Sequence, residues 1–229
     1  MKLFARRKVF ENPLHKHVAS EFEVNNWILS DFVLARLIPA VGYHPFPLNE
    51  LMLMASAVCY FRPTLILEWG THIGKSARVF YETTKAFGID CEIHSTDLPD
   101  DVPHQEHPHR KRGGLVNGLN EVILHRGDGL TCSLEICRRK TDSGNRLFFV
   151  DGDHQYETVR SELDAILTAV PNASVLLHDT FYQSEEANYN IGPYKAVKDV
   201  LANYGNKYKV IQMNTGLPGM TLVYPRKNA

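Results

Sequence analysis

The sequence lacks the cysteine patterns that mark zinc sites and redox motifs. Its 229 residues contain four cysteines and no Cys-x-x-Cys pair. Each cysteine lies in or beside an apolar segment, which is typical of reduced thiols in a protein core. We therefore expect a soluble, cytoplasmic protein without disulfides.

The sequence also lacks a strong net charge and a long apolar run. The formal charge is -1 and the isoelectric point is about 6.8, so the whole molecule has no field that attracts nucleic acid or an anionic membrane. The longest apolar run, 51–61, is interrupted by Ser56 and is far shorter than the roughly 20 residues of a spanning helix. The basic N-terminus is not followed by the apolar core of a signal peptide. Neither nucleic acid nor a membrane is expected as a partner.

Short apolar segments alternate with helical segments over most of the chain. This order predicts an α/β fold with a parallel sheet and helical crossovers. The strands are predicted at 64–67, 91–96, 122–125, 146–150 and 174–177, and the helices at 76–87, 130–139, 157–169 and 193–204. Two further strands, 208–214 and 220–224, flank Thr-Gly-Leu-Pro-Gly and predict a hairpin. The expected architecture is a doubly wound, mostly parallel, seven-stranded sheet that ends in a C-terminal antiparallel hairpin.

The N-terminal part has a different pattern. Between Val18 and Val41 the apolar residues recur at helical spacing, which predicts one or two amphipathic helices. These helices either pack on the main domain or form a substrate lid. We therefore divide the chain into an N-terminal helical extension, 1–47, and a main domain, 48–229, which begins with a helix at 48–60.

The stretch from Leu65 to Phe80 predicts a strand, a tight glycine turn and the start of a helix. Such a unit forms a ligand-binding crevice at the carboxyl end of the strand. The segment Gly70-Thr-His-Ile-Gly-Lys-Ser is one residue short of a P-loop, and Gly-x-Gly-x-x-Gly is absent. A P-loop-like nucleotide hydrolase remains an alternative because Lys75 and Asp151 could serve phosphate and magnesium.

Acidic residues fall at or just beyond the ends of five successive predicted strands: Glu68, Asp97, Asp128, Asp151 and Asp179. The carboxyl ends of parallel strands lie along one edge of a sheet, and neighbouring strands are about 4.8 Å apart. The acids should therefore converge. An acidic edge repels a pyrophosphate and suits a ligand that carries positive charge.

These motifs in this order resemble the class I S-adenosylmethionine-dependent methyltransferases. The resemblance rests on Glu68-x-Gly70-x-x-x-Gly74, the acid at 97, Gly127-Asp128 and Phe149-Val-Asp-Gly-Asp-His-x-Tyr156. It is strongest to the branch that contains the catechol and caffeoyl-CoA O-methyltransferases and their bacterial small-molecule relatives, and it covers residues 48–225. It implies a Rossmann-like methyltransferase fold and S-adenosylmethionine, whose ammonium and sulfonium groups suit the acidic edge. The implied cofactor-binding residues are Glu68, Gly70, Thr71, Gly74, Ser76, Asp97, Gly127, Asp128 and Asp151.

The resemblance also gives roles to individual acids. Asp97 would accept hydrogen bonds from the ribose hydroxyls, Asp128 would face the adenine amino group, and Asp151 would lie at the methionine end. Each acid has an alternative role as a helix N-cap.

The residues after the fourth and fifth predicted strands are the catalytic candidates: Asp151, His154 and Asp179. In the metal-dependent branch, two acids and an asparagine hold magnesium or calcium, which lowers the pKa of a substrate hydroxyl. Asp151 and Asp179 match the acids, with His178 as a third metal ligand, but Thr180 stands in place of the asparagine. His154 takes the place of the lysine base of the catechol enzymes, and it is the alternative route for removing the proton. His154 could instead stack on adenine or cap the next helix.

The predicted function is S-adenosylmethionine-dependent O-methylation of a hydroxyl on a small molecule, with or without Mg²⁺ or Ca²⁺. A non-catalytic S-adenosylmethionine-binding domain is the second alternative, beside the nucleotide hydrolase. A homodimer is one expectation for the assembly. The His-rich segment 98–114 carries histidines 104, 107 and 109 and is expected to be a solvated surface loop rather than a metal site. If it acts in function, the expected role is a mobile cover over the crevice.

Overall fold

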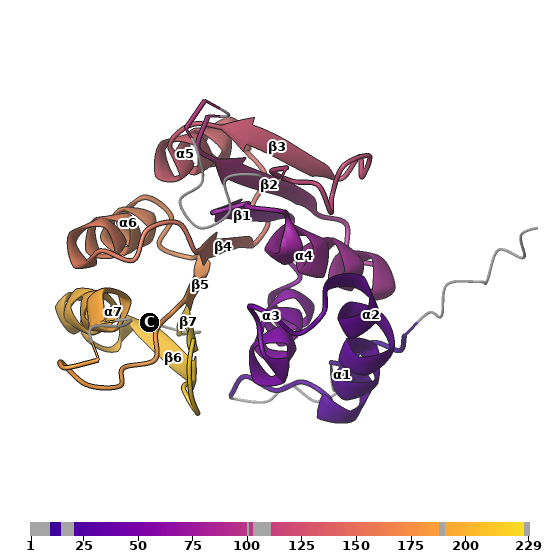
Figure 1. Cartoon of the computed structure of the whole chain (residues 1–229), viewed down its shortest axis with the longest axis horizontal. Coiled ribbons are helices and arrows are strands. Elements are labelled where there is room, and N and C mark those ends of the chain that lie inside the picture. Colours follow the sequence, from indigo (N-terminus) through magenta and orange to yellow (C-terminus); the bar gives the residue numbers. More distant parts are fainter. Residues whose placement is uncertain (1–9, 15–20, 100, 103–110, 188–190, 227–229) are drawn as a thin grey trace, which may run out of the picture.

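The protein is built on one seven-stranded sheet (Figure 1). The computed structural model describes residues 10–14, 21–99, 101–102, 111–187 and 191–226. The strand order is β3-β2-β1-β4-β5-β7-β6. The first five strands are parallel, and β7 is antiparallel to both β5 and β6. The strands are β1 (Leu65–Trp69), β2 (Glu92–Asp97), β3 (Val122–Arg126), β4 (Arg146–Val150), β5 (Ser174–His178), β6 (Tyr208–Met213) and β7 (Met220–Pro225).

Helices cover both faces of the sheet (Figure 1). One face carries the N-terminal helices and the two that follow: α1 (Asn26–Phe32), the π-helix η1 (Val33–Leu37), α2 (Ile38–Val41), α3 (Leu48–Phe61) and α4 (Lys75–Ala86). The other face carries α5 (Gly129–Arg139), α6 (Tyr156–Ala169) and α7 (Ile191–Tyr204). A short 3-10 helix, η2 (Gly205–Lys207), leads into β6.

The central strands are buried because helices cover both faces of the sheet. Every residue of β1, β4 and β5 is buried, as is usual for parallel strands between two helical layers. Alternate side chains enter opposite layers. On β1, Ile66 packs toward α3 and α4, whereas Leu65 and Leu67 pack toward α5 and α6.

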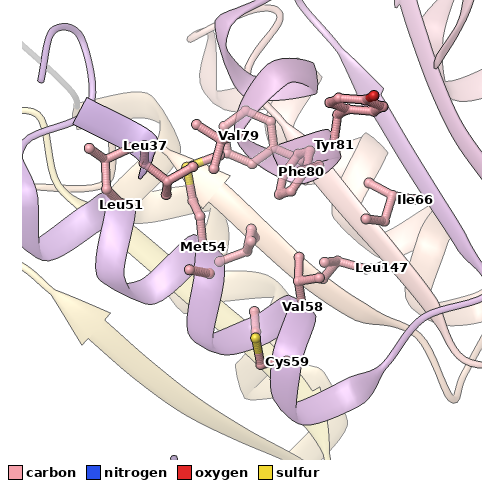
Figure 2. Close-up of a cluster of buried hydrophobic side chains, with 14 of the residues drawn as sticks. Leu37, Leu51, Met54, Val58, Cys59, Ile66, Val79, Phe80, Tyr81 and Leu147 are labelled. Atoms are coloured by element: carbon pink, nitrogen blue, oxygen red, sulfur yellow. The ribbon is translucent and has the colours of Figure 1, made fainter. Parts of the chain in front are cut away.

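The layer that contains α3 and α4 forms a continuous hydrophobic core against the sheet. Figure 2 shows Met54 and Val58 of α3 and Val79 and Phe80 of α4 gathered beside Ile66. Met54, Val58, Val79 and Phe80 are all fully buried. This packing fixes the start of α3 relative to the carboxyl ends of the strands, which matters for the site described below.

The N-terminal helices pack into the same core. The side chains of Leu29, Phe32 and Leu37 are fully buried there, and Arg36 forms an ion pair with Glu82 of α4 at 2.6 Å. The burial of these apolar side chains is the packing arrangement expected from their helical spacing. A lid role stays a prediction.

The predicted seven-stranded architecture, with its antiparallel hairpin, is confirmed. No helix within the described ranges is both long and apolar enough to cross a membrane. The histidines of the predicted covering loop lie outside the described residues.

Candidate active site

The glycine turn after β1 is held against the end of β4. Gly70 has φ 88°, and its N–H donates to the Thr96 carbonyl at 3.1 Å. A Cβ on Gly70 would lie 1.9 Å from the Asp151 carbonyl oxygen, so only glycine fits. Gly74, with φ 88°, is the N-cap of α4. The turn therefore brings the backbone of 70–74 directly beside the strand end that carries Asp151.

Glu68 is buried under this turn. Register places it beside Ser95 of β2, whose hydroxyl donates to Glu68 Oε1 at 2.5 Å and lies 2.6 Å from the Thr71 hydroxyl. Burial raises the pKa of Glu68 to about 7, against the lowering effect of the Ser95 and Ser76 hydroxyls. Its second oxygen, Oε2, has no hydrogen-bond partner among the described residues. A cationic group on a ligand would favour the ionised form of this carboxyl.

Asp97 ends β2 and braces the same turn. Its Oδ2 accepts the His72 N–H at 2.7 Å, and its Oδ1 accepts the Leu98 N–H at 2.7 Å. The Arg112 Nε lies 3.3 Å from Oδ1. Each carboxylate oxygen has two lone pairs, so acceptor capacity for a ribose hydroxyl remains. The predicted ribose contact stays a prediction.

Asp128 is the N-cap of α5. Its exposed side chain accepts the Thr131 N–H at 2.7 Å, which is the alternative role that the sequence left open. It follows Gly127, with φ 135°, at the end of the edge strand β3. The contact of Asp128 with the adenine amino group stays a prediction.

Asp151, His154 and Asp179 form a compact group at the ends of β4 and β5. They offer one ligand atom each, and these atoms lie within 4.8 Å of one another. His154 Nε2 is 3.1 Å from Asp179 Oδ2 and 3.9 Å from Asp151 Oδ1. Both carboxylates raise the pKa of His154, with Asp151 the larger cause, although partial burial opposes them. Two oxygens and one nitrogen at this spacing suit a divalent cation.

His178 lies behind this group and is enclosed by acids. Its Nδ1 is 3.1 Å from Asp151 Oδ1 and 3.3 Å from Asp179 Oδ2, and its Nε2 is 3.0 Å from Glu50 Oε2. Phe46 packs edge-on to its ring at 4.9 Å. Burial opposes protonation of His178, but the three carboxylates outweigh it and raise the pKa well above the usual value.

The group of residues that could hold a metal ion therefore differs from the predicted metal set. The sequence indicated His178 as the third ligand, but both of its ring nitrogens face carboxylates. His154 takes that place in the structure. Thr180, in the asparagine position, accepts a hydrogen bond from Thr221 of β7 at 2.8 Å and is not part of the group.

Sequence reasoning missed Glu50. This residue of α3 is fully buried and contacts His178, 128 residues away along the chain. The available signal was an acid inside an apolar helix, Leu48-Asn-Glu-Leu-Met-Leu-Met, but nothing in the pattern gave its partner.

Lys75 and Ser76 do not form a phosphate site of their own. The Lys75 ammonium contacts the His44 carbonyl oxygen, and buried Ser76 adjoins Glu68. An acid directly below the turn is unfavourable for a phosphate. This arrangement weakens the nucleotide hydrolase alternative.

Comparisons with known proteins show a family match and a shared fold. Residues 67–180 match the family described as a methyltransferase domain, and no curated protein sequence matches the chain. An O-methyltransferase of Bacillus cereus, solved with S-adenosylhomocysteine, has a TM-score of 0.56 at 13% identity, and the match covers 86% of this chain and 90% of that one.

Two further solved structures have the same fold. The methyltransferase PaMTH1 of Podospora anserina, bound to S-adenosylhomocysteine, has a TM-score of 0.54 at 18% identity, over 92% of this chain and 100% of that one. TomG of Streptomyces achromogenes, bound to S-adenosylmethionine, has a TM-score of 0.51 at 16% identity, over 83% of this chain and 89% of that one.

The fold and the family match thus define a class, the Rossmann-like transferases that use S-adenosylmethionine. Within it, the chain belongs to the S-adenosylmethionine-dependent methyltransferases, and residues 67–180 carry the methyltransferase domain.

Proposed function

We propose that the protein transfers the methyl group of S-adenosylmethionine to a hydroxyl of a small molecule. The observation that carries this proposal is the contact between Gly70 and the Asp151 carbonyl. It places the cofactor turn beside the Asp151–His154–Asp179 group at the carboxyl edge of the sheet. Cofactor and acceptor would then meet within the reach of the same side chains, as in-line displacement requires.

The cofactor would lie along the turn of residues 70–76. Gly70, Thr71, Gly74 and Ser76 belong to this turn and Glu68 lies under it. The missing Cβ atoms of the two glycines allow close approach of a ligand. The unpartnered Oε2 of Glu68 supports a positively charged group at this point. Asp97, Gly127, Asp128 and Asp151 complete the proposed set along the carboxyl edge.

The hydroxyl proton has two proposed destinations. Asp151, His154 and Asp179 fit a divalent cation such as Mg²⁺ or Ca²⁺, which would lower the pKa of the hydroxyl. Without one, His154 Nε2 would take the proton, and the nearby Asp179 carboxylate would stabilise the resulting imidazolium. In both cases Asp179 would lie next to the acceptor oxygen.

The acceptor is proposed to be a small molecule with a ring. TomG is involved in tomaymycin synthesis, and the rings of Tyr182 and Tyr194 stack at 4.9 Å in the segments that follow Asp179. A flat aromatic pair suits a catechol or a sugar. A cytoplasmic homodimer remains our expectation for the protein in the cell.

The test is transfer of a labelled methyl group to a library of catechols and sugars. We expect a methylated product from the parent, and a rate at least about 100-fold lower from Asp179→Asn. Asp90→Asn, at the exposed amino end of β2, is the matched control and should leave the rate unchanged. If EDTA abolishes the parent rate, the cation route is supported, and if the rate is untouched, His154 is left as the base.

Two outcomes would contradict the proposal. Cofactor binding with no product from any acceptor would indicate a non-catalytic S-adenosylmethionine-binding domain. ATP binding that is lost in Lys75→Ala would instead indicate the nucleotide hydrolase.

A further inference from the structure

Glu50 is a charged residue in an apolar setting. It lies in the first turn of α3, and its exposed fraction is 0%. Its helix neighbours Leu51, Leu53 and Met54 are also buried. Burial of a carboxylate is costly unless its oxygens are hydrogen-bonded, so the two partners of Glu50 explain how it is tolerated there.

The first partner, a side chain, connects Glu50 to Asp151 and Asp179, which we call the acid pair. Glu50 Oε2 lies 3.0 Å from His178 Nε2. The opposite nitrogen of the same ring, Nδ1, lies 3.1 Å from Asp151 and 3.3 Å from Asp179. Glu50 thus fixes one end of a ring whose other end contacts both carboxylates.

The second partner, a backbone N–H group, connects Glu50 to the residues next to Asp179 of the acid pair. Glu50 Oε1 accepts the Gly219 N–H at 2.9 Å, in the turn between β6 and β7. The carbonyls of Pro218 and Gly219 accept the N–H groups of Phe181 and Thr180, at 3.0 and 3.1 Å. These bonds hold the two residues that follow Asp179, and the backbone of Asp179 itself is left-handed, with φ 56°.

We infer that Glu50 is a positioning residue that holds Asp151 and Asp179 together as a ligand pair for a divalent cation. This inference rests on the proposed function, because the pair acts there on the acceptor hydroxyl. Residues that orient metal ligands from behind commonly change metal affinity by about 10- to 100-fold when they are replaced. A purely structural residue at this place in α3 could be apolar, like its neighbours.

The test measures the affinity for Mn²⁺ by electron paramagnetic resonance, because Mn²⁺ should bind only when the Asp151 and Asp179 carboxylates are held close together. We expect the parent to bind Mn²⁺ and Asp179→Asn to lose this binding. Glu50→Leu keeps the size of the side chain but removes both acceptors, so its affinity should fall by about 10- to 100-fold. Glu50→Gln retains polar groups opposite both partners and should recover part of the loss, even if Glu50→Leu does not fold.

The matched control is Glu82→Gln. Glu82 is another buried glutamate with two partners, Arg36 and Arg78, but neither partner contacts the acid pair. Its Mn²⁺ affinity should equal that of the parent. Parent-like Mn²⁺ affinity in both Glu50 variants would overturn the inference, and so would a parent that binds no Mn²⁺ at an Asp179-dependent site.

Calorimetry with S-adenosylhomocysteine on the same preparations separates this inference from the proposed function. A parent that binds S-adenosylhomocysteine while Glu50→Leu and Glu50→Gln keep the parent's Mn²⁺ affinity would contradict the role of Glu50 alone. A parent that does not bind S-adenosylhomocysteine would contradict the proposed function, whereas the Mn²⁺ comparison would still decide the role of Glu50.

Discussion

Asp179 combines a carboxylate of the proposed site with an unusual backbone conformation. Its φ of 56° is left-handed, a region that non-glycine residues rarely adopt. The hydrogen bonds of the next two residues to the β6–β7 turn hold this conformation. Strained residues of this kind cluster at functional sites, which agrees with the proposed role of Asp179.

The left-handed backbone predicts that glycine at position 179 is more stabilising than alanine, the opposite of the order inside a helix, although both substitutions remove the carboxylate. Asp179→Gly should be more stable to urea than Asp179→Ala by about 1 kcal/mol, because glycine has no Cβ to clash in the left-handed region. At Asp164, inside α6, the order should reverse, since glycine is the weaker helix former. An alanine variant at 179 as stable as the glycine variant would contradict the strain.

Glu68 makes the free energy of unfolding depend on pH. Burial raises its pKa to about 7, from an ordinary value of 4.5. The folded protein therefore keeps this proton between those two values while the unfolded chain loses it. In that window the folded state binds more protons, so a rise in pH lowers the free energy of unfolding.

Glu68→Gln should remove this pH dependence. The parent should lose on the order of 3 kcal/mol of stability from Glu68 between about pH 4.5 and 7, and the variant should lose correspondingly less in urea titrations across that range. Glu135→Gln, on the exposed surface of α5, is the control and should keep the parent slope. An equal slope in Glu68→Gln would show that Glu68 is ionised throughout the range.

At the scale of elements, the N-terminal helices are joined to the main domain by both core packing and charge. Arg36 of η1 and Arg78 of α4 both pair with buried Glu82, at 2.6 and 2.7 Å. A buried carboxylate that loses a partner is destabilising. Removal of the Arg36–Glu82 ion pair therefore tests how strongly residues 26–41 are held on the main domain.

Arg36→Met should lower the free energy of unfolding by about 2 kcal/mol, since hydrogen bonds to charged groups contribute roughly 1.5–3 kcal/mol. Arg139→Met removes the exposed pair with Glu135 and should cost less than about 1 kcal/mol. Urea denaturation measures both. Equal losses in the two variants would mean that the ion pair does not hold the helices.

The elements themselves were predictable because their signals are local. Buried parallel strands such as Arg146–Val150 and Ser174–His178 appear in the sequence as short apolar runs with acids beyond them, and most predicted bounds lie within one or two residues of the observed ones. The hairpin of β6 and β7 follows from its Gly- and Pro-containing turn. Local pattern sufficed for these elements.

At the scale of the molecule, the acidic edge was predictable and its supporting contacts were not. Parallel topology alone brings Asp151 and Asp179 to neighbouring strand ends. In contrast, the contact of Glu50 with Gly219 joins residues 169 positions apart, and the exchange of His178 for His154 depends on which way two side chains point. Such choices are made by tertiary packing, which a single sequence does not display.

The central claim is that the carboxyl edge of the sheet binds S-adenosylmethionine, and calorimetry with S-adenosylhomocysteine tests it most directly. We expect the parent to bind, and Asp97→Ala to bind at least about tenfold more weakly, because Asp97 braces the turn and is proposed to contact the ribose. Asp90→Ala, at the opposite end of β2, is the control and should bind as the parent does. The absence of binding by the folded parent, or unweakened binding by Asp97→Ala, would contradict the account.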